Sequence, residues 1–203
     1  MHPLIRKFSS IPRQLLLLVL LVLASCAGNI KLDTATITDA NIMRPQTAMV
    51  KPAVITFSSY WEKEQRRDHS GSDIDGLHNR YTQVLTRSVE KALTKQGWTI
   101  VTEASPETVM VNTIIENMRI TAPDFRGAQV NLYSKDEHGS GDFTLTFEIQ
   151  GKTQAIFKDK RKVMAGAGGG QLNRTSRVIN QHAFGRELER FIEDALKSET
   201  QPL

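Results

Sequence analysis

The chain has 203 residues, of which 39% are hydrophobic, with a formal net charge of +4 and a single cysteine. One cysteine rules out an internal disulfide, so core packing has to hold the fold, and a chain of this length can bury enough surface to do so. Three of the 26 basic residues (Arg6, Lys7 and Arg13) and no acidic residue precede Cys26, which leaves 23 basic against 22 acidic residues after it. Because nucleic-acid binding depends on neutralising phosphates, this near balance gives no support for a nucleic-acid partner.

The first 25 residues have the pattern of an export signal. Basic residues are followed by an apolar run from Leu15 to Ala24 and then by the small residue Ser25, which matches the charged, apolar and cleavage regions of a signal peptide. A transmembrane anchor is the alternative, but about 10 apolar residues cannot cross a hydrocarbon core that needs about 20. We therefore expect a signal peptide over 1–25, with cleavage between Ser25 and Cys26.

The residues around this cleavage site, Leu23-Ala24-Ser25-Cys26, resemble the lipobox of bacterial lipoproteins. The resemblance implies that Cys26 becomes the first residue of the mature protein and carries acyl chains, which makes the membrane its first partner. In lipoproteins of enteric type, an aspartate directly after the cysteine favours the inner membrane. This chain has Ala27 there, so the resemblance implies the periplasmic face of the outer membrane.

Three segments are expected after the signal. The segment 26–48 is rich in small and polar residues without sustained periodicity, so we expect the lipidated cysteine and a tether. A single folded domain is predicted over 49–198, because its helical and strand patterns follow one another without a long linker. A short tail is expected over 199–203.

Alternating apolar residues predict the strands of the domain. The first strand is expected over 50–57. The charged stretch 58–75 is predicted to be a loop, in which 60–67 has the composition for a helical turn. Further strands are predicted over 98–102, 108–121 and 143–149, with a tight turn at Gln150-Gly151-Lys152 that leads into a hairpin strand over 153–163.

Two amphipathic helices complete the predicted domain. Apolar residues recur at steps of three and four from Ile74 to Leu93, with Asp73 or Ser72 as the predicted N-cap and Gly97 at the C-cap. A second apolar stripe predicts a helix over 176–197. We expect an α/β fold: a two-layer sandwich of a mostly antiparallel sheet with the two long helices on one face.

This order of elements, together with the lipobox, resembles an uncharacterised family of Gram-negative outer-membrane lipoproteins. The resemblance spans most of the mature chain, although it rests on the pattern of strands and helices and on no catalytic signature. A similar architecture occurs in auxiliary lipoproteins of envelope transport and assembly machines. At the level of the fold alone, such a likeness does not define a function.

No motif of catalysis, metal binding or cofactor binding is recognised in the sequence. The glycine run 166–170 lacks the Lys-Ser or Lys-Thr pair of a phosphate-binding loop and is interpreted as a connector. His69, His78, His138 and His182 do not form a paired metal-ligand motif. No Gly-x-Ser-x-Gly turn is present. We therefore expect a protein that is not an enzyme and that has no metal and no cofactor.

Tyr60 and Trp61 are the candidate partner-binding residues, because amphipathic aromatic residues are enriched at protein interfaces. The alternative interpretation is that Trp61 packs in the core. We expect a lipid-anchored accessory or binding protein of the Gram-negative envelope that acts on an envelope protein partner. Two alternatives stay open: a hydrolase with an unrecognised site, and a lipid-binding carrier with a hollow core.

Overall fold

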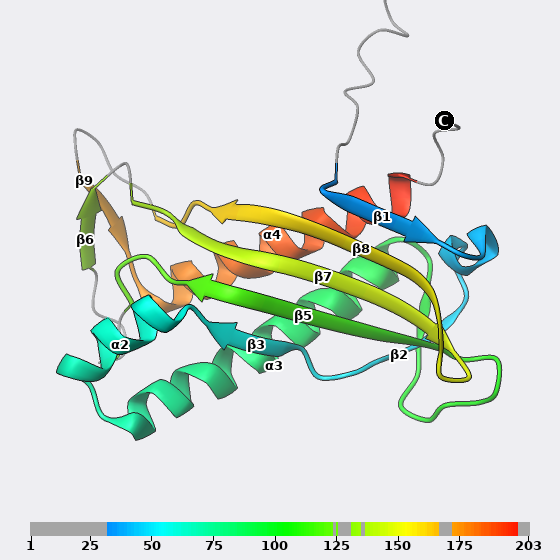
Figure 1. Cartoon of the computed structure of the whole chain (residues 1–203), viewed down its shortest axis with the longest axis horizontal. Coiled ribbons are helices and arrows are strands. Elements are labelled where there is room, and N and C mark those ends of the chain that lie inside the picture. Colours follow the sequence, from blue (N-terminus) through cyan, green and yellow to red (C-terminus); the bar gives the residue numbers. More distant parts are fainter. Residues whose placement is uncertain (1–31, 124, 126–130, 135–136, 167–171, 199–203) are drawn as a thin grey trace, which may run out of the picture. The chain divides into compact units, whose positions relative to one another are not determined.

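The computed structural model describes residues 32–123, 125, 131–134, 137–166 and 172–198 (Figure 1). The predicted signal peptide and tail lie outside these residues. No helix in the described part of the chain is long and apolar enough to span a membrane. The elements are β1 (Thr34–Ile37), the 3-10 helix η1 (Ala40–Met43), β2 (Thr47–Val50), β3 (Val54–Phe57), α2 (Ser59–Asp68), α3 (Gly71–Lys95), β4 (Thr99–Ile100), β5 (Val109–Arg119), β6 (Asn131–Ser134), β7 (Gly139–Ile149), β8 (Lys152–Val163), β9 (Leu172–Thr175) and α4 (Arg177–Ser198).

The main sheet has seven strands in the order β1-β8-β7-β5-β2-β4, and β3 pairs with β5 beside β2. The run from β1 to β5 is antiparallel throughout, whereas β2 and β3 join β5 in parallel. Both long helices, α3 and α4, lie on the same face of this sheet (Figure 1). The predicted α/β sandwich is therefore confirmed. A separate two-stranded sheet pairs β6 with β9.

Alternation along β7 separates the core from an open face. Phe143 and Phe147 are buried towards the helices, where their rings lie 5.8 Å from Phe191 and 5.7 Å from Trp98. The alternating residues Thr144 and Thr146 are half-buried on the opposite face. Gln150 and Gly151, both with positive φ (50° and 74°), form the two-residue turn into β8 that the sequence predicts.

The long helices are bounded by recognisable caps. Ser70 caps α3 through its hydroxyl, and the side chain of Asp73 bonds back to the Ser70 amide, so the cap lies two to three residues before the predicted position. Gly97 adopts φ +88° directly after the C-cap, as expected. At the crossing of the helices, a Cβ on Gly185 would lie 2.6 Å from the Ser88 hydroxyl, so a glycine allows this close approach.

Glu189 of α4 joins the two helices, because it accepts hydrogen bonds of 2.7 Å from both Lys91 and Lys95 of α3. Partial burial disfavours its charged form, but the two lysine bonds outweigh this effect and hold the pKa of Glu189 below its ordinary value of 4.5. A carboxylate with a lowered pKa stabilises the fold above that ordinary value, and this contribution is lost as the pH falls through the lowered value.

We expect Glu189→Gln to reduce the free energy of unfolding by about 1 kcal/mol at pH 7, because the lysine partners are largely exposed and screened. The cost should shrink towards zero at an acidic pH below the lowered pKa of Glu189, where the wild-type carboxylate also becomes neutral. Urea unfolding at both pH values measures it, with Glu103→Gln on an exposed loop as control. An equal cost at both pH values would contradict the assignment.

The expectation of a tether over 26–48 is wrong for residues 32–48, and the domain does not begin at residue 49. β1 pairs with β8 from Thr34↔Lys158 to Ile37↔Ala155, and Ile42 in η1 is buried. β1 is a short edge strand whose hydrogen bonds come from a distant strand, so local periodicity does not indicate it. The folded unit begins at Leu32.

The expected loop over 58–75 is also wrong, because 59–68 forms α2 and α3 begins at Gly71. The helical turn that the composition of 60–67 allows is confirmed, as part of α2. The Ser58 hydroxyl caps α2 by accepting a hydrogen bond from the Trp61 amide at 3.3 Å. Trp61 is the one buried residue of α2. A helix held by one apolar side chain has no repeating stripe, which explains why the periodicity of the sequence does not predict it.

Candidate functional site

The candidate site lies where β5 ends and the chain continues through residues 120–123. A bulge at Asn117 (φ 52°) shifts the pairing of β5 with β7 between Glu116 and Arg119. Ala122 follows with φ 42°, a left-handed conformation that is uncommon for a residue with a Cβ atom. Such conformations persist only where the surroundings determine them, and they are concentrated at functional sites.

Three consecutive backbone carbonyls in this segment accept hydrogen bonds from side chains of three different elements. Trp61 Nε1 of α2 donates to Ile120 at 3.0 Å, Asn180 Nδ2 of α4 donates to Thr121 at 2.9 Å, and Asn131 Nδ2 of β6 donates to Ala122 at 3.0 Å. A segment that leaves a sheet has carbonyls without ladder partners, and here side chains supply those partners. The bonds fix the path of 120–122, which we call the pinned segment.

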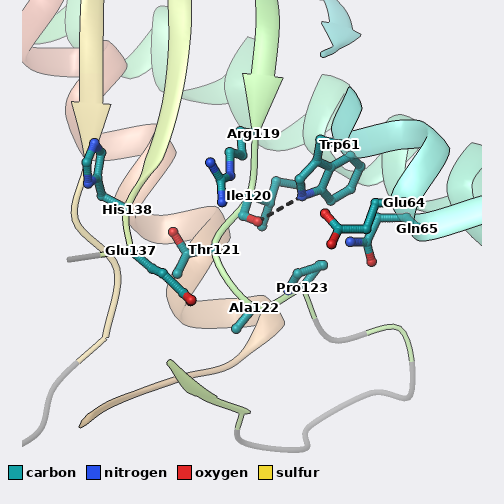
Figure 2. Close-up of a pocket in the computed structure, with 10 residues that line it drawn as sticks. All are labelled: Trp61, Glu64, Gln65, Arg119, Ile120, Thr121, Ala122, Pro123, Glu137 and His138. Atoms are coloured by element: carbon teal, nitrogen blue, oxygen red, sulfur yellow. Dashed lines mark hydrogen bonds between the residues drawn. The ribbon is translucent and has the colours of Figure 1, made fainter. Parts of the chain in front are cut away.

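A pocket of about 200 Å³ lies on the pinned segment (Figure 2). Residues of α2, of the chain after β5 and of the approach to β7 line it. Figure 2 shows Arg119, Thr121, Glu137 and His138 on one side of the pinned segment and Glu64 and Gln65 of α2 on the other. The lining residues are Trp61, Glu64, Gln65, Arg119, Ile120, Thr121, Ala122, Pro123, Glu137 and His138.

The polar groups of this pocket are largely uncommitted. Within the residues that the structure describes, the Arg119 guanidinium and the carboxylates of Glu64 and Glu137 form no ion pair or side-chain hydrogen bond. Thr121 is 4% exposed, and its hydroxyl is buried and has no partner in the same part of the chain. A buried hydroxyl without a partner costs about 1–3 kcal/mol. The pocket therefore offers a ligand a positively charged donor, Arg119, and two negatively charged acceptors, Glu64 and Glu137.

The structure separates the two predicted partner-binding residues. Trp61 is 3% exposed, donates a hydrogen bond to the Ile120 carbonyl and has its ring centroid 4.7 Å from that of Phe57. It therefore belongs to the core, which confirms the alternative interpretation of this residue and makes it wrong as a partner-binding residue. Tyr60 is 75% exposed, and it lines a second hollow of about 180 Å³ with Lys63, Glu64 and Arg67. Binding of a partner by Tyr60 stays a prediction. Glu64 borders both hollows.

Two of the histidines considered as metal ligands make contacts within the fold. His69 stacks on Phe125 with ring centroids 3.8 Å apart, and a ring nitrogen of His78 bonds the Ile55 carbonyl at 3.0 Å. His138 lines the pocket on the pinned segment. In the described part of the chain, no three His, Cys, Asp or Glu side chains gather as metal ligands. Cys26 and the connector residues 167–170 lie outside the described residues.

Comparisons with known proteins give distant likenesses. No family model matches the chain, and no curated protein matches it either. A structure of the PelC dodecamer from Paraburkholderia phytofirmans aligns at 10% identity and a TM-score of 0.40, covering 83% of this chain and 98% of that one. A neuraminyllactose-binding hemagglutinin homolog from Helicobacter pylori aligns at 8% identity and a TM-score of 0.26, over 79% and 81%. Scores this low support no argument about the fold or function of this chain.

Proposed function

We propose that this protein is a lipid-anchored accessory protein on the periplasmic face of the outer membrane, and that it binds an envelope ligand or partner in the pocket on the pinned segment. The residues Leu23-Ala24-Ser25-Cys26 support the anchor. The acyl chains on Cys26 hold it to the membrane, because each buried methylene contributes about 0.8 kcal/mol. The folded unit begins at Leu32. A fully extended chain from Cys26 to Leu32 would span about 20 Å at most.

The pinned segment is the observation that carries the binding proposal. Three side chains from α2, α4 and β6 fix the backbone that bears Thr121 and follows Arg119. A fixed backbone holds polar groups in place before a ligand arrives, which lowers the entropic cost of binding. Uncommitted charges on such a frame fit a binding site better than an ordinary solvated surface.

Binding is favoured over the two alternative functions. Glu64 and Glu137 bring two carboxylates to one pocket, as a hydrolase would, but both residues are exposed, whereas an active site that excludes water strengthens the interactions of its catalytic groups. A lipid carrier needs a hollow core. Between the sheet and the helices, aromatic rings instead pack together, including Phe143 against Phe191 and Tyr81 against Phe184, whose centroids lie 5.6 Å apart.

Photo-crosslinking in Gram-negative cells tests the binding proposal. A photoreactive benzoyl-phenylalanine at Gln65 in the pocket should give adducts, seen as added mass on the intact protein, whether the ligand is small or a protein. The same group at the exposed Gln83 of α3 is the matched control. Adducts should form several-fold more at position 65, and equal yields at the two positions would refute the proposed site.

A further inference from the structure

We propose that the pocket on the pinned segment binds a zwitterion, namely a free amino acid or a short peptide with a free ammonium group and a free carboxylate. This inference rests on the proposed function and names the ligand class of the same site. It follows from the charges of the pocket, from the absence of ion pairs between them within the described residues, and from the buried, unpartnered hydroxyl of Thr121, a residue that lines the pocket.

The pocket has a partner for each end of such a ligand. Arg119 carries a planar guanidinium whose parallel N–H groups match the two oxygens of a carboxylate. Glu64 and Glu137 carry acceptors only, and an ammonium group carries donors only. In Figure 2, Glu64 lies across the pinned segment from Arg119, and Glu137 lies on the same side as Arg119. Neither carboxylate forms an ion pair with Arg119 within the described residues.

Elsewhere on this fold, oppositely charged side chains form ion pairs. Arg161 of β8 forms ion pairs with Asp159, Glu187 and Asp194 at 2.6–3.3 Å, in the same way that Glu189 pairs with its two lysines. Arg119 and the two pocket carboxylates form no such pair within the described residues. Charges that face one hollow without meeting across it are available to a ligand that carries both complementary charges.

Thr121 also lines the pocket, two residues after Arg119. Its hydroxyl is buried without a partner among the described residues. A hydroxyl can donate to a carboxylate or accept from an ammonium group. The backbone carbonyl of Thr121 is held by Asn180, so this residue keeps a fixed position beside the pocket.

Ligands with a single charge fit less well. A phosphate or other anion would pair with Arg119 but would meet two carboxylates in the same pocket, and like charges are disfavoured. A simple cation would leave Arg119 without a partner. A zwitterion supplies a partner for Arg119 and a partner for the carboxylates, and it adds no net charge to the site.

Calorimetry on the detergent-solubilised full-length protein tests the inference with dialanine as the probe. Dialanine should bind, and acetylation of its amine or amidation of its carboxylate should each weaken binding by about tenfold or more, the effect of losing one charged hydrogen bond. Arg119→Gln should weaken dialanine binding to a similar extent, while Arg87→Gln on the exposed face of α3 leaves it unchanged. Glu64→Gln is the second variant should Arg119→Gln fail to fold, with thermal melting as the check.

Two results would overturn the inference. Equal binding of dialanine and of its doubly blocked form would show that the charged ends are not recognised. Absence of dialanine binding to a folded protein would refute the zwitterion as well. In either case, adducts at position 65 in cells would leave the proposed binding function standing, whereas their absence would remove both proposals.

Discussion

Replacing Trp61 with alanine is expected to lower the free energy of unfolding by about 3–5 kcal/mol, the usual cost of deleting a buried aromatic side chain. The indole is 3% exposed, lies 4.7 Å from the Phe57 ring and donates to the Ile120 carbonyl at 3.0 Å. It is also the only buried residue of α2. Its loss should therefore detach α2 and free one end of the pinned segment, which removes a large share of the stability of a typical domain.

Two matched variants separate the parts of this effect. Trp61→Phe keeps a ring in the core but leaves the Ile120 carbonyl without its donor, so it should cost about 1–3 kcal/mol. Tyr60→Ala, one residue earlier and 75% exposed, should stay within about 0.5 kcal/mol of wild type. Urea unfolding followed by circular dichroism measures all three. Equal costs for Trp61→Ala and Tyr60→Ala would contradict the burial of Trp61.

Long elements with a repeating apolar pattern could be predicted from the sequence. α3 buries residues from Ile74 to Leu93 at helical spacing, and β7 alternates from Phe143 onward. Each of these elements places many side chains on one face of the core, so the period is visible over several turns or several residues. The fold class follows from them, because one-sided helices need a sheet face to cover.

Short elements could not be predicted in the same way. β1 has four residues and owes its structure to backbone pairing with β8. α2 is held by its Ser58 cap and by a single buried side chain. Neither β1 nor α2 shows a repeating pattern of apolar residues, because the contacts that bury them come from residues that are distant in the chain.

For a related reason, the sequence does not indicate that the residues of the candidate site lie together. Trp61, Asn131 and Asn180 bond carbonyls of residues 120–122, and a backbone carbonyl carries no signature of residue type. The turn signal at Ala122 and Pro123 marks where β5 ends, but it does not indicate which side chains meet there. Arg119 of β5 and Glu137, which precedes β7, line one pocket because β5 pairs with β7, and only the fold provides this pairing.

The second large effect is expected at Cys26. Cys26→Ser should move the protein from the membrane fraction to the soluble periplasmic fraction or leave it uncut, because a serine offers no sulfur for acylation. A single acyl chain binds membranes with a K on the order of 10⁴ M⁻¹, and several chains make release negligible. The loss of the acylated mature form should therefore be nearly complete in either case. Thr34→Ser, on β1 after the proposed anchor, is the matched control and should remain membrane-bound.

Lipid anchoring at Cys26 is tested by the intact mass of the protein extracted from membranes. We expect a chain that begins at Cys26 and carries the added mass of acyl groups, all of which map to the peptide that contains this cysteine. A membrane-bound protein that retains residues 1–25, or a mature chain whose Cys26 is a free thiol, would contradict it.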